Sequence, residues 1–550
     1  MIALLARTRL VRRSENHTDS VCPPRSITAA QACFVALLFG LVPAANAADV
    51  TGKIDRDIGS SGRKTYAVFV RMADQLLGGR GLYERFCVEH AGAKRRELRP
   101  AIVRTLRAKA DGSWGRVATR VAELEKSGKV RDLDRYWIVN GFTCDATGDA
   151  CQRLAELEEV AFVYLQRGPL RQVKQHRGPD QPAATPEKER FFRQSIAQWE
   201  DDSDEPFTTQ GFTLSWNLST IQVDAAWNEE KVTGRGVVVA LNDTGIMLTP
   251  ALTRALWRNP REVFNGKDDD GDGYVDDVFG YDFAGDSYWN IGDDLKWPHG
   301  SMCAGIIAGR PINGLNLLTG VAPRARLMVL RGMGYLKAYE YALAHGADVL
   351  SLSYMWEDVP LGHYRGVYRT ALEHLSAAGI VAVGGAGNYS RLRRGKEIAL
   401  PKDVPCVITA AGITRDGRKA DESSEGPCTW DGVKFYEDYP PSRPLAKPDV
   451  TGVFGGFPRW ARPENGEIFS KENDQMALVD VRGGNSFTGA QTAGVAALML
   501  SANPDVCPWE VKAIMEKTCR DLGRKGRDYT FGAGLLQARD AVHAARAVAR

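Results

Sequence analysis

Residues 237–245 read VVVALNDTG, an apolar run typical of a buried strand that leads directly into polar residues and a glycine. Further apolar runs follow at 327–330, 348–352, 380–383 and 407–411, with helical stretches such as 335–345 and 368–378 between several of them. Apolar strands that alternate with helices predict a parallel sheet with helices on both faces. We therefore expect an α/β fold for residues 214–550, with its ligands at the carboxyl ends of the strands.

The composition of the 550 residues excludes several classes of protein. Hydrophobic residues make up 44% and charged residues 25% of the chain, which is ordinary for a globular protein and excludes a disordered or fibrous one. Lys and Arg number 71 against 68 Asp and Glu, a net charge of +3. This balance argues against a nucleic-acid partner.

The N-terminus is typical of a secretory signal peptide. Basic residues precede an apolar run at 27–42, and Ala45-Asn46-Ala47 is a small-x-small cleavage site. At about 16 residues the run is short for a membrane span. We therefore expect cleavage after Ala47, a secreted (extracellular or periplasmic) protein and no membrane span afterwards. Retention of residues 1–47 as an anchor remains the alternative.

Residues 48–167 are predicted to form a small α+β domain. Its expected strands are 66–72, 136–142 and 160–166. The expected helices are 151–158 and 95–125, the second broken at Asp111-Gly112. Residues 168–213 are polar and rich in Pro, Gly and acidic side chains, so they are predicted to be a protease-accessible linker that contains a maturation site.

The chain has ten cysteines, which fits an oxidising destination without a dense disulfide framework. Cys22 and Cys33 would leave with the signal peptide. The candidate disulfides are Cys144 with Cys151 and Cys406 with Cys428. Cys507 and Cys519 bracket a predicted helix of about 18 Å, too long for a disulfide. Cys303, in an apolar helix, is expected to be a buried thiol.

Three polar motifs lie where catalytic groups would be expected. Asp243 follows the strand at 237–241, His299 opens a helix of small apolar residues, and Ser486 stands where a glycine turn becomes a helix. Each has a plain structural interpretation by itself: a turn, a capping or core histidine, and a serine N-cap.

Taken together, in the order Asp, His, Ser, these motifs resemble the subtilisin-like serine peptidase family, the subtilases. Shorter matches support the resemblance, which covers about residues 214–545: GVAP at 320–323, GADV at 346–349, AGN at 386–388 and KPDV at 447–450. The resemblance implies a subtilisin-like α/β fold. It also implies that Ser486 is the nucleophile, that His299 takes its proton, and that Asp243 orients and stabilises the imidazole. The Asn388 amide and the Ser486 N–H would stabilise the oxyanion.

The sequence departs from the family at several positions near these motifs. Asn485 replaces a threonine, Ala490 and Gln491 replace a proline and a histidine, and Ser301 replaces a threonine. By resemblance, Ser353, Tyr354 and Met355 form an edge along which the substrate backbone pairs. Gly385, Ala386 and Gly387 form the opposite wall of the specificity pocket. Met355 stands where the family has glycine, so we expect a narrower cleft.

The 48–167 domain resembles the inhibitory propeptide of the family, through residues 136–142 and 154–166. The resemblance implies that the chain carries its own intramolecular inhibitor. An unrelated accessory domain is the alternative interpretation.

An acidic stretch, DDDGDGYVDD at 268–277, lies between Asp243 and His299. Alternating carboxylates followed by glycine can surround calcium, and Asp268, Asp270 and Asp272 are the candidate ligands. The EF-hand pattern is incomplete because Phe279 stands at position twelve. A structural calcium site and a solvated acidic turn both remain open, and the chemistry itself needs no cofactor.

The sequence therefore predicts a secreted serine endopeptidase that hydrolyses protein or peptide substrates through an acyl-enzyme. An inactive binding or scaffold protein on the same fold is the alternative, although the four implied catalytic groups are intact. A nucleotide-binding protein is disfavoured because no Gly-x-Gly-x-x-Gly follows the strand at 237–241.

Overall fold

The computed structural model describes most of the chain from residue 50 onward. The described residues are 50–59, 64–167, 190, 192–194, 196–197, 199, 207–288, 291–293, 298–311, 317–356, 359–390, 397–457 and 483–549. The predicted signal peptide and most of the predicted linker lie outside them. Within these residues, no helix is long and apolar enough to cross a membrane.

Seven parallel strands form the central sheet, in the order β13-β12-β11-β10-β6-β9-β7. They are β6 (Val238–Asp243), β7 (Gly280–Asp282), β9 (Arg326–Arg331), β10 (Val349–Leu352), β11 (Val381–Gly385), β12 (Ile408–Ile413) and β13 (Val450–Val453). The predicted α/β class and parallel sheet are confirmed. A parallel sheet places the carboxyl ends of all seven strands at one edge, and Asp243 is the last residue of β6.

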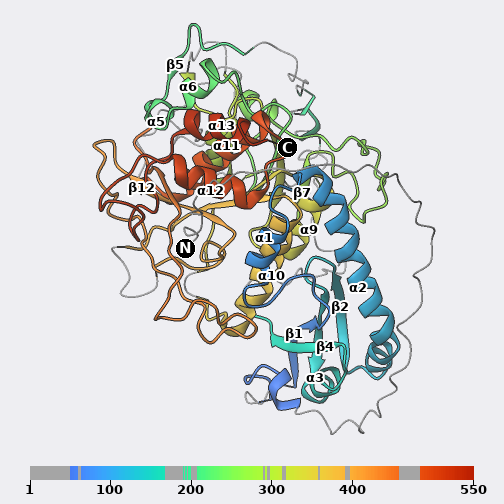
Figure 1. Ribbon diagram of the computed structural model, residues 1–550. Helices are drawn as coiled ribbons and strands as arrows, with labels where there is room; N and C mark the ends of the chain where they lie inside the picture. Colours follow the sequence, from blue (N-terminus) through green and yellow to red (C-terminus); the bar gives the residue numbers. More distant parts are fainter. Residues whose placement is uncertain are drawn as a thin grey trace, which may run out of the picture. The chain divides into compact units, whose positions relative to one another are not determined.

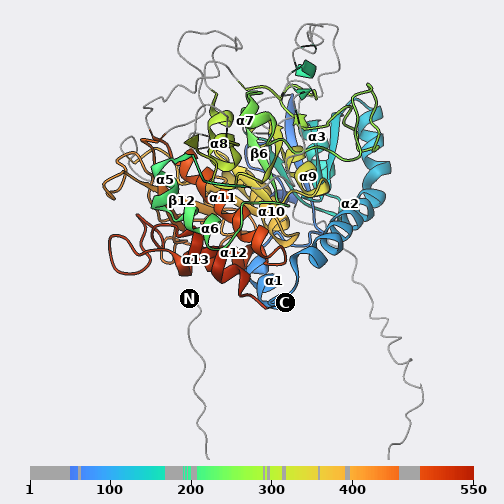
Figure 2. The same ribbon diagram turned by 90° about the horizontal axis from the view of Figure 1, so that it is seen from above.

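Helices cover both faces of this sheet. Val239 and Leu241 of β6 pack into one core with α8 (His299–Ala308), α11 (Asn485–Ala502) and α13 (Ala538–Arg546). Ala240, between them, belongs to the core on the opposite face, with α9 (Leu336–Ala344) and α10 (Arg365–Ala377). This division follows from the two-residue repeat of a strand. Figure 2 shows α11 in the middle of this part, with α12 (Pro508–Thr518) and α13 nearby.

Shorter elements complete this part of the chain. They are β5 (Thr213–Leu214), α5 (Trp216–Thr220), α6 (Val223–Asn228), α7 (Pro250–Thr253), β8 (Leu317–Leu318) and η2 (Gly362–Tyr364). Strands β5 and β8 pair in parallel as a separate two-stranded sheet.

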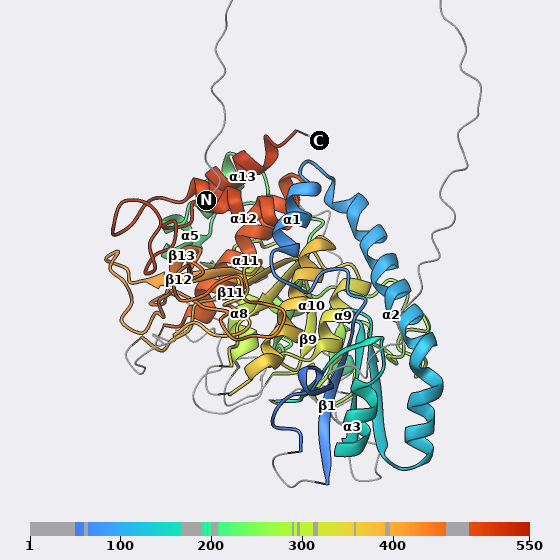
Figure 3. The same ribbon diagram turned by 60° about the horizontal axis from the view of Figure 1, so that its bottom comes forward.

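The N-terminal domain contains an antiparallel sheet of four strands in the order β2-β3-β1-β4. Its strands are β1 (Thr65–Met72), β2 (Val130–Tyr136), β3 (Gly141–Thr147) and β4 (Val160–Leu165), and its helices are η1 (Val50–Lys53), α1 (Leu82–Glu89), α2 (Arg95–Lys126) and α3 (Gly148–Ala155). Figures 1 and 3 show α2, in blue, running from α1 at one end to this sheet at the other.

Two local predictions for this domain are wrong. Residues 136–142 are not one strand, because residues 137–140 form the turn between β2 and β3 and two of their N–H groups bind Glu340. The helix over 95–125 is not broken at Asp111-Gly112. Ala110, Ser113 and Val117 are buried there, and Asp111 pairs with Arg135 at 2.9 Å, so tertiary contacts outweigh the weak helix propensity of Gly.

The N-terminal domain and the α/β domain share a continuous apolar core. Phe69, Tyr136 and Tyr164 belong to the same buried cluster as Tyr364 and Tyr368 of the α/β domain. Polar contacts reinforce it: Glu340 of α9 accepts hydrogen bonds from the N–H groups of Trp137 (2.5 Å) and Ile138 (2.9 Å). The two domains therefore pack as parts of one compact unit.

Each of the eight described cysteines is present as a thiol, so neither candidate disulfide is formed in this structure. Cys144 lies in β3 and Cys151 in α3, where both are buried in the apolar core of the N-terminal domain. Cys303 is the buried thiol expected from the sequence, and burial raises its pKa well above the ordinary value.

Candidate active site

The carboxyl end of β6 meets the beginning of α8 at a close backbone approach. A Cβ atom on Gly300 would lie 2.1 Å from the carbonyl oxygen of Gly245, so glycine is required at position 300. This approach brings Asp243, the last residue of β6, next to His299, the first residue of α8.

Asp243 and His299 form a short hydrogen bond, with 2.6 Å between Oδ1 and Nδ1. The side chain of Asp243 is 1% exposed and that of His299 is 12% exposed. Burial of the imidazole lowers its pKa, but the charge and hydrogen bond of Asp243 outweigh this, so the pKa of His299 is raised above its ordinary value. The pair therefore stabilises a protonated imidazole.

A second carboxylate, Asp293, holds this pair in place. Its Oδ2 accepts hydrogen bonds from the Ser301 N–H (2.7 Å) and hydroxyl (2.6 Å), and its Oδ1 accepts one from the Thr244 hydroxyl (2.5 Å). Thr244 Oγ1 in turn accepts the Gly300 N–H at 2.9 Å. Burial raises the pKa of Asp293 despite these bonds. The sequence analysis missed Asp293. The one feature of the sequence that could have indicated it is its position shortly before the helix that begins at His299, because acidic side chains are favoured near helix N-termini.

Ser486 lies in the first turn of α11, where backbone N–H groups have no partner within the helix. Its hydroxyl donates to the Ser353 carbonyl oxygen at 3.2 Å, and the Ser353 hydroxyl donates to the Ser486 carbonyl oxygen at 3.2 Å. The ring of the next residue, Phe487, lies 6.5 Å from the His299 ring between centroids. His299 therefore stands beside the first turn of α11.

Asn388 lies next to the same turn. Its Oδ1 accepts the Asn485 N–H at 2.8 Å, which orients the amide so that its Nδ2 group remains a donor. A Cβ on Gly484 would lie 3.7 Å from that Nδ2, so the amide nitrogen faces the turn before Ser486. The Asn388 amide, the Ser486 N–H and the N-terminal end of α11 together suit an anionic oxygen.

Asn485, a departure from the family pattern, ties the neighbouring segment to this turn. Its Nδ2 donates to the Gly387 carbonyl oxygen (2.5 Å) and to Ser423 Oγ (3.0 Å). A Cβ on Gly385 would lie 1.7 Å from the Asn485 carbonyl oxygen, so glycine alone allows this approach. The residues after β11 are thereby fixed beside Ser486.

The predicted substrate edge, Ser353 to Met355, directly follows β10, the sheet neighbour of β11. The Tyr354 side chain points into the protein, where its hydroxyl hydrogen-bonds to the Tyr339 hydroxyl (2.7 Å) and donates to Asn242 Oδ1 (2.9 Å). The backbone carbonyl oxygen of Tyr354 accepts a hydrogen bond from Lys402 Nζ. The Tyr354 side chain is therefore held inside the protein, and the Ser353 carbonyl oxygen accepts a hydrogen bond from the Ser486 hydroxyl.

Comparison with known proteins identifies the family. The sequence pattern of the subtilase family matches residues 234–534. The chain belongs to the subtilase family. The matched residues include all four implied catalytic groups, which the structure brings to one edge of the sheet.

Several curated proteases are similar to this subtilase. Fervidolysin of Fervidobacterium pennivorans is 26% identical over 58% of this chain and 42% of its own length. A calcium-dependent protease of Trichormus variabilis is 26% identical over 66% and 53%, and bacillopeptidase F of Bacillus subtilis is 25% identical over 82% and 29%. The chain thus spans about half or less of these relatives. A crystal structure of MycP1 with the N-terminal propeptide removed matches 60% of this chain and 96% of its own, with 22% identity and a TM-score of 0.39.

Two overlapping groups of side chains in and around the acidic stretch of this subtilase could hold a metal ion. One is Glu262, Asp268 and Asp270, and the other is Asp270, Asp272 and His345. The sequence analysis named the three aspartates but missed Glu262, outside the motif, and His345, which follows α9. The structure divides the named aspartates between the two groups, with Asp270 in both.

Three buried carboxylate oxygens in this cluster have no hydrogen-bond partner among the described residues: Glu262 Oε2, Asp270 Oδ1 and Asp277 Oδ1. Burial raises the pKa of Asp277 to about 7, although its hydrogen bond with Tyr341 lowers it. Buried carboxylate oxygens without a donor are costly and suit a hard cation such as calcium. The carboxylates of Glu262, Asp268 and Asp270 therefore fit a bound calcium ion, whereas in the second group His345 Nε2 lies 3.0 Å from Asp272 Oδ2 as an ion-pair partner.

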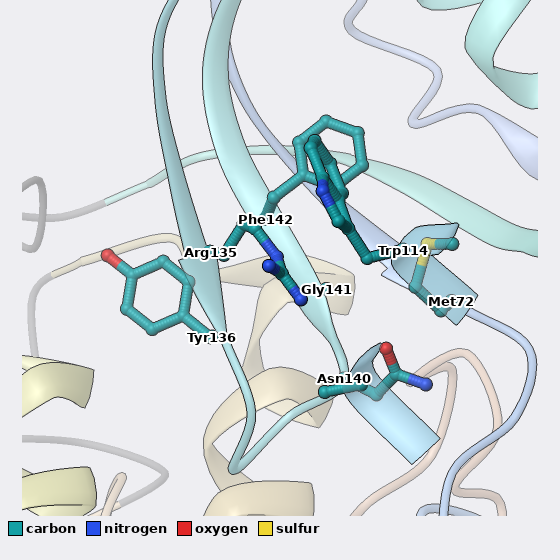
Figure 4. A pocket seen from close by; sticks show the side chains of 8 residues that line it. Met72, Trp114, Arg135, Tyr136, Asn140, Gly141 and Phe142 are labelled. Atoms are coloured by element: carbon teal, nitrogen blue, oxygen red, sulfur yellow. The ribbon is translucent and has the colours of Figure 1, made fainter. Parts of the chain in front are cut away.

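A separate small pocket lies in the N-terminal domain, between α2 and the four-stranded sheet (Figure 4). Met72, Trp114, Arg135, Asn140 and Phe142 are among the residues that line it. The Arg135 guanidinium lies 4.8 Å from the Trp114 ring centroid. None of the implied catalytic groups lines this pocket, and it is no part of the candidate active site.

Proposed function

We propose that this subtilase is a secreted serine endopeptidase that hydrolyses peptide bonds through an acyl-enzyme. The observation that carries the proposal is the buried Asp243–His299 pair, 2.6 Å apart, beside the helix turn that presents Ser486. A serine hydroxyl is a weak nucleophile until a base takes its proton, and the raised pKa of His299 suits that base.

In the proposed reaction, Ser486 Oγ attacks the carbonyl carbon of the scissile bond while His299 takes the hydroxyl proton. Asp243 stabilises the imidazolium that forms. The carbonyl oxygen becomes an anion and accepts hydrogen bonds from the Asn388 amide and the Ser486 N–H. His299 then donates its proton to the leaving amine as the C–N bond breaks. Water, activated by His299, releases the acyl group from Ser486.

The test uses the chain from Ala48 onward, as wild type and as Ser486→Ala. Wild type should hydrolyse casein and react with a fluorophosphonate probe at Ser486, identified by peptide mapping. Ser486→Ala should do neither while keeping the wild-type circular dichroism spectrum. A folded wild-type protein that neither reacts nor hydrolyses even after residues 48–167 have been removed would instead support the inactive binding or scaffold protein.

We also propose that residues 48–167 are an inhibitory propeptide that helps the α/β domain to fold. The contacts of Glu340 with residues 137 and 138, and the shared apolar core, support this role. Parallel sheets form slowly because their contacts are non-local, so a template would help. Residues 48–167 added in trans should inhibit the mature enzyme, and N-terminal sequencing should place the mature start between Arg167 and Ser215. A start near Ala48 would make the domain a permanent part of the enzyme.

Secretion and calcium binding complete the proposal. The predicted signal peptide at 1–47 supports export, and cell fractionation of the full chain would test it. The unpartnered oxygens of Glu262, Asp270 and Asp277 support a structural calcium, and two of the relatives are named calcium-dependent proteases. Calcium bound there would neutralise the carboxylates and hold the 262–277 segment, and the residues named in the reaction are separate from it.

A further inference from the structure

Two segments flank Ser486 at the ends of neighbouring strands. Ser353 exchanges two hydrogen bonds of 3.2 Å with Ser486, and on the other side the Gly387 carbonyl oxygen accepts from Asn485 at 2.5 Å. If the substrate binds along the proposed edge, Ser353 to Met355, opposite the proposed wall, Gly385 to Gly387, the side chain beside the attacked carbonyl lies between these two segments, in the region called the slot below. That side chain belongs to P1, the residue that supplies the attacked carbonyl.

An apolar, closely packed cluster supports the segment that contains Ala386. Ala386, Ile398 and Cys428 form a buried cluster, and Leu445 packs against it. Ala399, next to Ile398, is 8% exposed. The three clustered side chains are fully buried, so they support the segments on either side of the slot and do not themselves contact a ligand.

The Met355 side chain crosses the slot from one wall to the other. Its Sδ accepts the Ala399 N–H at 3.2 Å, and its Cε lies 2.7 Å from the position that a Cβ on Gly387 would take. The segment that carries it is also anchored, because the Trp356 N–H donates to the Leu400 carbonyl oxygen at 2.9 Å. Met355 thus contacts both the backbone at Ala399 and the proposed wall at Gly387.

We propose that Met355 occupies the P1 slot, so that this enzyme cleaves after glycine or alanine in preference to large side chains. The inference rests on the proposed peptidase function. A phenylalanine or leucine at P1 would have to displace the methionine, which breaks its hydrogen bond and its contacts with Gly387. Protein interiors tolerate added volume poorly, and one methylene more or less in an apolar pocket changes kcat/KM about 10–200-fold.

The experiment measures kcat/KM on peptide substrates that are identical except for Gly, Ala, Leu or Phe at P1. The wild-type enzyme, Met355→Gly and Met355→Leu are compared, each normalised to its fluorophosphonate-reactive Ser486. Wild type should prefer Ala to Phe by about 10²-fold, because a phenyl group can enter only if Met355 moves away from Ala399 and Gly387. Met355→Gly should reverse this preference, whereas Met355→Leu retains most of the volume and should keep it.

The outcomes separate this inference from the proposed function. A wild-type enzyme that reacts with the probe but prefers Leu or Phe at P1 overturns the inference and leaves the peptidase function standing. So does a Met355→Gly enzyme with an unchanged Ala-to-Phe ratio. Wild type without residues 48–167 that neither reacts nor cleaves any of the peptides refutes the proposed function and this inference with it. If Met355→Gly lowers the thermal midpoint too far to assay, Met355→Ala takes its place, and an unchanged ratio there also overturns the inference.

Discussion

Arg95, at the start of α2, makes a buried ion pair with the α/β domain whose loss should weaken docking of the N-terminal domain. Its Nη1 lies 2.7 Å from Asp348 Oδ1, and its side chain is 5% exposed. Its Nε also donates to the Pro504 carbonyl oxygen at 2.7 Å. Removing one partner of a buried pair costs about 3–5 kcal/mol because the other charge stays buried.

Asp348 would keep two contacts after Arg95→Ala. The Val238 N–H donates to its Oδ2 at 2.9 Å, and Arg99 Nη2 lies 3.5 Å from its Oδ1. We therefore expect the lower end of the range, about 3 kcal/mol, which is roughly a 150-fold weaker association. Arg96→Ala is the matched control, because Arg96 pairs with Asp505 from a side chain that is 64% exposed. Its effect should be much smaller.

The assay uses the inactive Ser486→Ala chain with a site for a sequence-specific protease inserted within residues 168–189. After cleavage, the dissociation constant of the two fragments is measured by surface plasmon resonance for wild type, Arg95→Ala and Arg96→Ala. The reasoning fails if Arg95→Ala dissociates no more readily than Arg96→Ala while both fragments keep their circular dichroism spectra.

Three further predictions concern the active site and the acidic cluster. Asn388→Ala should lower kcat by about 10²–10³ with little change in KM, the loss measured for an oxyanion-hole donor in a subtilisin, and normal turnover would exclude Asn388 from that role. Activity requires neutral His299, whose pKa Asp243 raises, so kcat/KM should fall as pH falls through a pKa above about 6.5. Asp243→Asn should shift this fall in kcat/KM to lower pH. A wild-type enzyme whose kcat/KM falls only below that value would contradict the pairing of Asp243 with His299. Millimolar calcium, compared with EGTA, should raise the thermal midpoint of wild type and of Asp416→Ala but not of Asp270→Ala, since calcium at 100 times its dissociation constant adds about 2.7 kcal/mol; an unchanged wild-type midpoint would argue against the site.

Much of the fold could be predicted from the sequence because its signals are local. Residues 237–241 are all apolar. A strand with one solvent-exposed face would alternate apolar and polar residues, so these few residues already indicate a strand that is buried on both faces. The alternation of such runs with helices predicted the parallel sheet, and the motifs around Asp243, His299 and Ser486 indicated the family. The predictions at residues 111–112 and 136–142 are wrong for the opposite reason, because contacts with distant residues decide those two positions.

The tertiary structure alone decided which distant groups share a site and which buried oxygens have a donor. Glu340 binds a turn some 200 residues earlier in the chain, and Asp293 joins Thr244 to Ser301. The Met355 side chain reaches Ala399 and Gly387 because the segments after β10 and β11 leave neighbouring strands. Sequence spacing carries no record of these distances, since strand order in a parallel sheet differs from chain order. Burial of the Glu262 and Asp270 carboxylates likewise depends on packing from the whole chain. It leaves each carboxylate with one oxygen that has no hydrogen-bond donor and therefore suits a cation.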